Sequence, residues 1–230
     1  MKNISREGPG LLETVLEENE IGMDSVDLSI GEEWPDSGGY SAVFVFGGPA
    51  SANDESPRMK EELRKVKAFC EVGIPYLGVC LGMQILVKAS GGWVHSSTFK
   101  EIGWRDPDGN QFEVDLTTEG ERDPLFREVR SPLKVFQLHG ETVRLGTDMA
   151  LLGKGKYCEN QVVRMGKNAY GVQGHIEMTP TMLDEWIDRD PDLQAVDAHA
   201  LREDYRRVRR EYEQQGNKIL TNFLRVAEFV

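Results

Sequence analysis

Cys80 is the residue whose sequence neighbours most clearly indicate chemistry. It lies between Gly78 and Gly82 in the pattern Gly-x-Cys-x-Gly, which is a nucleophile-elbow pattern with a thiol in place of a hydroxyl. In such an elbow a strand turns abruptly into a helix, and flanking glycines relieve the crowding of the backbone. We therefore expect Cys80 to be exposed at the corner, where the helix N-terminus favours a thiolate. The N–H of Leu81 is then a ready donor to an oxyanion.

A cysteine nucleophile needs a base, and His175 is the best placed of the four histidines considered. It follows an apolar segment, and Glu177 lies two residues further on. Positions two apart in an extended segment point to the same side. Glu177 can therefore orient one ring nitrogen while the other faces Cys80. By contrast, His95 has no acid spaced to orient it, and His199 lies in an acidic helical region.

Each of these patterns has a simpler explanation when it is taken alone. Most free cysteines are small buried hydrophobes, and a lone His-x-Glu is more often a structural histidine beside a surface glutamate. The Gly-Gly-Pro sequence at residues 47–49 is by itself only a turn signal. In combination, these patterns favour a triad of Cys80, His175 and Glu177, with the backbone of Gly48 close to the group that the thiol attacks.

The elements that must position these residues follow an α/β pattern. We expect helices over residues 8–19, 61–72 and 81–89, strands over residues 26–30, 42–46 and 74–79, and a loop over residues 34–39. Alternating helices and strands indicate a mostly parallel sheet. Such sheets bind ligands at the carboxyl ends of their strands. Residues 47–49 and Cys80 both follow strand ends of this kind.

The second half of the chain has a different pattern. Short segments predict a largely antiparallel section, with strands over residues 101–104, 112–116, 133–138, 149–152, 161–165 and 169–173 and a hairpin-type turn over residues 106–110. A capped helix is expected over residues 182–189, and a long charged helix over residues 201–226 with a break near Gly216. The predicted fold is a three-layer, flavodoxin-like α/β structure with a mostly parallel central sheet, a small antiparallel section and a C-terminal helical extension.

Composition and charge exclude several classes of protein. The net charge is −12, which argues against a nucleic-acid partner, because phosphate contacts need clustered Lys and Arg. No apolar run approaches the roughly 18 residues that span a bilayer, and the first residues contain no apolar signal core. The 3 cysteines form neither a disulfide framework nor a paired metal-ligand spacing. We therefore expect a cytoplasmic protein with no membrane contact, no metal and no cofactor.

Several motifs together resemble the class I, triad-type glutamine amidotransferases, and the sequence is similar to the glutaminase domain of GMP synthase. The matching segments are residues 46–49, 78–84, 101–104, 136–141 and 174–177. The resemblance extends over residues 7–178. It implies an amidotransferase-like domain over residues 1–180, and we expect residues 181–230 to form a helical extension packed on the same domain.

The resemblance also implies a reaction. Cys80 attacks the side-chain amide of glutamine and forms a γ-glutamyl thioester, and His175 protonates the departing ammonia and then activates water. Glu177 orients His175 in this scheme. The implied oxyanion donors are the N–H groups of Gly48 and Leu81. The residues implied to hold the amino-acid end of glutamine are Gln84, Gln137, Leu138 and His139.

One departure from the family leaves alternatives open. Synthetases of this family usually carry Ser-His-Gly-Asp where this chain has Leu-His-Gly-Glu at residues 138–141. The carboxylate of Glu141 reaches farther than that of the usual aspartate, which puts the contact with free glutamine in question. A γ-glutamyl peptide cleaved by the same triad is therefore an alternative substrate. No ATP-pyrophosphatase motif follows residue 180. A separate synthetase subunit that uses the ammonia is therefore a candidate partner, and a catalytically silent partner subunit is the remaining alternative.

Overall fold

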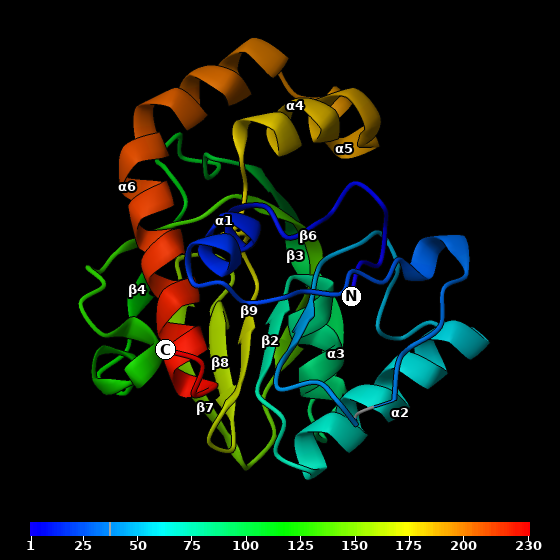
Figure 1. Ribbon diagram of the computed structural model, residues 1–230. Helices are drawn as coiled ribbons and strands as arrows, with labels where there is room; N and C mark the ends of the chain where they lie inside the picture. Colours follow the sequence, from blue (N-terminus) through cyan, green and yellow to red (C-terminus); the bar gives the residue numbers. More distant parts are fainter. Residues whose placement is uncertain (37) are drawn as a thin grey trace.

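A curled, mixed sheet of seven strands forms the middle layer of the protein, for which a computed structural model describes residues 1–36 and 38–230 (Figure 1). In spatial order the strands are β1 (Val43–Val45), β2 (Tyr76–Val79), β9 (Ala169–Val172), β8 (Val162–Met165), β7 (Met149–Gly155), β4 (Glu113–Leu116) and β5 (Leu133–Lys134). β1, β2 and β9 run parallel to one another, and every other neighbouring pair is antiparallel. The parallel part therefore places the carboxyl ends of β2 and β9 side by side.

Helices cover both faces of this sheet (Figure 1). α1 (Leu11–Glu18) and α6 (Ala198–Val226) bury their apolar sides against one face, together with Leu77 and Val79 of β2. α2 (Pro57–Glu71) and α3 (Leu81–Ala89) cover the other face, together with Tyr76. Successive residues of a strand point to opposite faces. All four residues of β2 are buried because both faces are covered.

A second, two-stranded antiparallel sheet lies beside the first. It pairs β3 (Trp93–Gly103) with β6 (Gln137–Arg144), so that Glu101 is opposite His139. The chain leaves β5 before it enters β6, and between them Phe136 forms an isolated bridge with His175. This bridge brings the start of β6 next to the end of β9, where the candidate site lies.

The remaining helices follow β9. α4 (Pro180–Arg189) begins at Thr179, whose hydroxyl accepts the N–H of Met182, and α5 (Pro191–Gln194) follows at once. Three short 3-10 helices connect other elements: η1 (Leu28–Ile30), η2 (Gly120–Arg122) and η3 (Pro124–Phe126). The three-layer fold, the small antiparallel sheet and the C-terminal helices agree with the sequence prediction.

Several local predictions are wrong. The strand expected over residues 26–30 is instead a short 3-10 helix, because Asp27 caps it by accepting the N–H of Ser29 at 2.9 Å. The strand expected over residues 133–138 is divided into β5 and β6. α2 starts at Pro57, four residues before the expected residue 61. The expected loop over residues 34–39 includes Ser37, which lies outside the described residues.

The break expected near Gly216 is also wrong, since α6 continues through it. A Cβ on this glycine would lie 2.3 Å from the carbonyl oxygen of Ile176. The glycine therefore allows the helix to pack closely on the segment that follows β9, and this packing outweighs its low helix propensity.

Candidate active site

Cys80 occupies the sharp turn between β2 and α3. Its backbone has φ 52° and ψ −108°, a strained conformation for a residue with a side chain. A Cβ on Gly78 would lie 2.4 Å from the carbonyl carbon of Gly82, and one on Gly82 would lie 2.0 Å from the carbonyl oxygen of Val45. The glycines on both sides are therefore required by the close approach of strand and helix, for the reason that the sequence suggested.

The thiol is less accessible than the sequence predicts. Cys80 is 5% exposed, so the expectation of an exposed corner is wrong. Its Sγ lies 3.8 Å from the carbonyl oxygen of Leu138 and 3.7 Å from Nε2 of Gln173. These groups from β6 and from the end of β9 cover the turn, because the long-range pairing of the strands brings them there. The thiol consequently lies in the wall of a cleft.

His175 and Glu177 follow the end of β9 and form a buried pair. Nδ1 of His175 lies 2.7 Å from Oε1 of Glu177, and both side chains are 1% exposed. The other carboxylate oxygen accepts the N–H of Ile176 at 2.9 Å. Burial would lower the pKa of His175, but the charge of Glu177 and the neighbouring Cys80 outweigh it, and the pKa is raised well above its ordinary value. The imidazole can therefore hold a proton that it passes to a leaving group.

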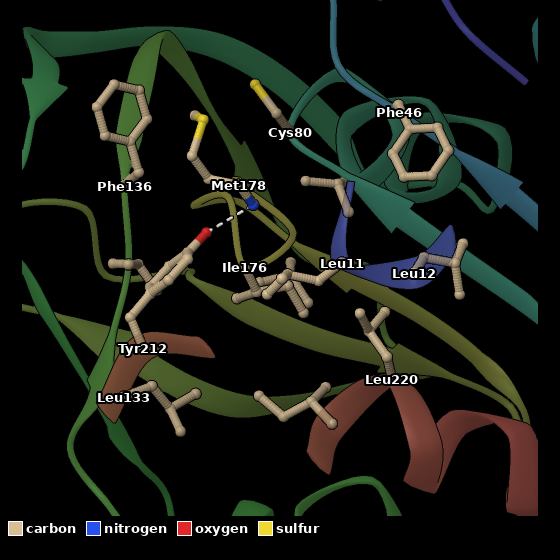
Figure 2. Packing of buried hydrophobic residues seen from close by; sticks show 14 of the residues in the cluster. Leu11, Leu12, Phe46, Cys80, Leu133, Phe136, Ile176, Met178, Tyr212 and Leu220 are labelled. Atoms are coloured by element: carbon tan, nitrogen blue, oxygen red, sulfur yellow. Dashed lines mark hydrogen bonds between the residues drawn. The ribbon is translucent and has the colours of Figure 1, made fainter. Parts of the chain in front are cut away.

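Groups from three other parts of the chain hold His175 in place. Its N–H donates to the carbonyl of Phe136 at 2.7 Å, and its carbonyl accepts the N–H of Phe136 at 3.1 Å. The hydroxyl of Tyr212 donates to the same carbonyl at 3.1 Å and accepts the N–H of Met178 at 2.9 Å (Figure 2). The rings of Trp186 and His175 pack in a T-shaped arrangement with 4.8 Å between their centroids. The position of the imidazole is thus fixed from several sides.

A cleft of about 480 Å³ opens beside Cys80. Its lining comes from the N-terminal segment, the loop after β1, the start of α3, the small sheet and the α4–α5 corner: Arg6, Glu7, Gly48, Pro49, Ala50, Ser51, Cys80, Leu81, Gln84, Lys100, Leu138, His139, Gly140, Glu141, Asp190, Pro191 and Asp192. A groove of about 490 Å³ near Tyr40 is similar in size but contains none of the predicted site residues. The predicted site residues therefore distinguish the candidate cleft, whereas the cavity volumes do not.

The two predicted oxyanion donors, Gly48 and Leu81, both line the cleft. Leu81 is the first residue of α3, where a backbone N–H has no partner inside the helix. Within residues 1–36 and 38–230, neither N–H donates a hydrogen bond to another protein group. These two donors are therefore available to a substrate oxygen in the cleft.

The predicted substrate-binding residues are divided between the cleft and the interior. Gln84 and Leu138 line the cleft, and Nε2 of Gln84 donates to the carbonyl of Glu141 at 3.3 Å. The imidazole of His139 turns inward, with Nε2 2.8 Å from Oε2 of Glu101. Gln137 is 1% exposed and does not contribute to the lining. The alternation of side chains along β6 explains this division.

One buried cluster within the described residues has the composition of a metal site. The ligand atoms of Glu101, His139 and Cys158 lie within 4.8 Å of one another. Burial raises the pKa of the Cys158 thiol to about 11, and its Sγ lies 3.1 Å from the hydroxyl of Thr142. Nδ1 of His139 donates to the carbonyl of Glu141 at 3.0 Å. We interpret the cluster as a buried imidazole–carboxylate contact that supports β6 where it borders the cleft.

Sequence reasoning missed a group of charged residues at the rim of the cleft. Arg6 pairs with Asp190 at 2.7 Å, and Lys100 pairs with Asp192 at 2.7 Å. Glu7 lies beside them and is 4% exposed. These residues come from the chain start, β3 and the α4–α5 corner, and none lies in a recognisable motif. Only the tertiary structure brings them to the same place.

Comparisons with known proteins identify the family and the fold. Residues 12–190 match the family model described as glutamine amidotransferase class-I. The chain belongs to the class I glutamine amidotransferases. A solved glutamine amidotransferase from Thermotoga maritima has a TM-score of 0.84 and 28% identity, with 98% of this chain and 95% of that chain covered. The fold and the family are therefore established together.

Curated relatives match over part of their length. The glutamine amidotransferase-like protein YfeJ of Salmonella typhimurium is 31% identical over 150 residues, which are 63% of this chain and 60% of that protein. A glutamine-hydrolyzing GMP synthase of Natranaerobius thermophilus is 35% identical over 150 residues, 61% of this chain but only 25% of the synthase.

Within the described residues, no helix is both long and apolar enough to cross a membrane.

Proposed function

We propose that this amidotransferase hydrolyses the side-chain amide of glutamine through Cys80, His175 and Glu177. One observation carries the proposal: Cys80 and His175 follow the adjacent parallel strands β2 and β9. Glu177 lies 2.7 Å from the ring nitrogen Nδ1 of His175. A thiol, an imidazole and an orienting carboxylate are the set that acyl transfer requires.

The reaction proceeds in two halves. The thiolate of Cys80 attacks the amide carbon, and the developing oxyanion accepts hydrogen bonds from the N–H groups of Gly48 and Leu81. His175 passes its proton to the nitrogen as the C–N bond breaks, which leaves a γ-glutamyl thioester and ammonia. Water then attacks the thioester while His175 accepts its proton, and glutamate leaves. Glu177 keeps the imidazole oriented throughout. These side chains and backbone N–H groups supply all of this chemistry, so the scheme needs no cofactor.

The cleft supplies candidate contacts for the rest of the substrate. Gln84 and the backbone around Leu138 line it and bind the amino-acid end of glutamine in this scheme. His139 acts through its backbone, because its imidazole faces Glu101. Gln137 supports this segment from inside, where a Cβ on Gly174 would lie 3.0 Å from its Oε1.

A γ-glutamyl peptide is the second candidate substrate. The cleft volume of about 480 Å³ is in the range of sites that hold ligands larger than an amino acid. Glu141 lines it and accepts a hydrogen bond from Ser51 at 3.0 Å, so a carboxylate is available to an amino group of such a peptide. The scissile bond is again a γ-amide, and the same three residues cleave it.

We extend the proposal to the organisation of the chain and to its partners. Residues 1–180 form the glutaminase unit, and residues 181–230 are a helical extension packed on it; the bond from Tyr212 to the carbonyl of His175 supports this packing. A synthetase subunit that uses the ammonia is the candidate partner, since GMP synthases match only over a quarter of their length. The three free cysteines support a cytoplasmic location.

The test is release of ammonia and glutamate from purified protein, with glutamine and a γ-glutamyl dipeptide compared side by side. We expect turnover of at least one substrate and a loss of at least about 10³-fold in Cys80→Ala. Preference for the dipeptide supports the second candidate. Inactivity on both substrates, in isolation and with a captured synthetase, identifies a silent subunit. Full activity of Cys80→Ala refutes the assignment of the nucleophile.

A further inference from the structure

Glu7 carries a buried carboxyl group to which the proposed mechanism assigns no role. The residue is 4% exposed, yet it lines the cleft beside Cys80. Within residues 1–36 and 38–230, its carboxylate has no hydrogen bond and no ion pair to a protein group. Burial raises its pKa to about 7. Its oxygens are not among the fully buried unpaired polar atoms of the described residues, so they face the open cleft that Glu7 lines. A carboxyl group that is desolvated without a protein partner, beside a reactive thiol, indicates a role in this cleft.

Gly47 shows how close Glu7 lies to the reacting groups. A Cβ on this glycine would lie 2.2 Å from Oε2 of Glu7, 3.1 Å from Cε1 of His175 and 3.3 Å from Cβ of Cys80. The three groups therefore surround one point at the end of β1. Only a residue without a side chain leaves this space free, and the carboxylate of Glu7 reaches into it.

The segment that carries Glu7 is held against the site. The carbonyl of Arg6 accepts the indole N–H of Trp186 at 2.9 Å, and its guanidinium pairs with Asp190. The N–H of Leu11 donates to the carbonyl of Glu177 at 2.8 Å. These bonds fix the chain on both sides of Glu7, so the carboxylate is held in place before a substrate arrives.

We propose that Glu7 binds the nitrogen that leaves from the scissile amide, a role that rests on the proposed amide hydrolysis. As the sulfur of Cys80 bonds to the amide carbon, the C–N bond breaks and the proton of His175 passes to the nitrogen. The carboxylate of Glu7 accepts a hydrogen bond from an N–H of that group. This bond holds the nitrogen beside His175 during proton transfer, and it strengthens as positive charge develops on the nitrogen.

The experiment compares two substrates that share an acyl group and differ in the leaving atom. Glutamine releases ammonia, whereas the γ-methyl ester of glutamate releases methanol, which offers no N–H during C–O cleavage. We measure kcat/KM for both substrates, because this constant covers the steps up to release of the leaving group. Glu7→Gln should lower kcat/KM for glutamine by about tenfold to a hundredfold, the value of a charge-assisted hydrogen bond. Turnover of the ester should stay nearly unchanged.

A matched control is Glu62→Gln, which removes another buried carboxylate, 0% exposed in α2 and outside the cleft lining. Glu62→Gln should change kcat/KM for the two substrates by the same factor.

A second measurement needs no variant. In the wild type, the ratio of kcat/KM for the amide to kcat/KM for the ester should rise as the pH increases through about 7. The reason is that the protonated carboxyl group of Glu7 loses its proton over this interval and becomes the carboxylate that accepts the hydrogen bond. The other charged groups that face Glu7 are Arg6, His175, Glu177 and Asp190; all of them act on both substrates.

The outcomes separate the two proposals. If Glu7→Gln lowered kcat/KM for the amide and the ester equally, Glu7 would be a structural residue. If it lowered kcat/KM for neither, Glu7 would have no role in the reaction. A pH-independent ratio in the wild type would contradict the proposal even if the variant failed to fold. Wild-type inactivity on glutamine, its γ-methyl ester and a γ-glutamyl dipeptide, or activity that survives Cys80→Ala, would refute the amide hydrolysis and the role of Glu7 with it.

Discussion

Replacing Tyr212 with Phe removes one hydroxyl that links α6 to the strand end carrying His175. This hydroxyl accepts the N–H of Met178 at 2.9 Å and donates to the carbonyl of His175 at 3.1 Å. The side chain is 1% exposed, and Figure 2 shows it enclosed by apolar neighbours such as Leu133. Water therefore cannot take the place of the lost oxygen.

The loss of stability in Tyr212→Phe can be worked out from the groups that the missing hydroxyl leaves unpaired. Two buried backbone groups lose a partner, and each unsatisfied group costs about 1–3 kcal/mol. The carbonyl of His175 keeps the N–H of Phe136, so its cost lies at the low end. The ring itself remains and continues to pack against Trp104 at 5.1 Å, so no cavity adds to the loss. We expect the free energy of unfolding to fall by about 2–4 kcal/mol.

The assay is urea-induced unfolding followed by both circular dichroism and tryptophan fluorescence. The matched control is Tyr157→Phe, which removes a hydroxyl bonded to Asp108 on the exposed surface. We expect the control to change the free energy of unfolding by less than about 0.5 kcal/mol. Equal slopes against urea concentration in the variants would ensure that the comparison concerns stability alone.

The reasoning would be refuted by a loss in Tyr212→Phe no larger than that of the control. Such a result would mean that the two backbone groups find other partners when the hydroxyl is absent. A loss of the expected size should be accompanied by lower amide hydrolysis, because the hydroxyl holds the backbone of His175. Unchanged turnover in the folded variant would show that Phe136 alone suffices to position the base.

Three further predictions concern the site and its supports. Glu7→Gln should raise the free energy of unfolding above pH 7 by up to about 3 kcal/mol, measured by urea unfolding at several pH values. Burial raises the pKa of Glu7 from 4.5 to about 7, so the wild type loses stability relative to the variant as the pH rises through this interval; a constant difference would contradict the assignment. Gly82→Ala should lower the melting temperature strongly and cost more than about 3 kcal/mol, because its Cβ would lie 2.0 Å from the carbonyl oxygen of Val45; a near-native melting temperature would show that the elbow yields. His175→Asn should lower kcat by at least about 10³-fold and His139→Asn far less, and similar losses would mean that the base is assigned wrongly.

The elbow could be predicted from the sequence because it depends on short-range contacts. The two glycines, Cys80 between them and the helix formers after Leu81 lie within a few residues of one another. The crowding of Gly78 against Gly82 is local, whereas Gly82 must also leave room for the carbonyl oxygen of Val45 on β1. The pairing of His175 with Glu177 is local in the same sense, since two residues in an extended segment suffice to place both side chains on one side.

Other local signals were overridden by tertiary contacts. Gly216 predicts a helix break, but close packing on Ile176 keeps α6 continuous. His139 lies in a motif that the family resemblance assigns to substrate binding, yet the pairing of β6 with β3 turns its imidazole toward Glu101. The register of two strands far apart in sequence determines this direction, and a single sequence does not reveal it.

The sequence by itself determined the family, the nucleophile candidate and its proposed base, because these depend on residue types at short spacings. Only the tertiary structure decided how deeply Cys80 is buried and which residues surround it. Arg6 and Asp190 are 184 positions apart and still pair at 2.7 Å, and Glu7 approaches His175 only because Gly47 leaves room between them. Contacts of this kind come from the packing of distant segments, and no pattern within either segment encodes them.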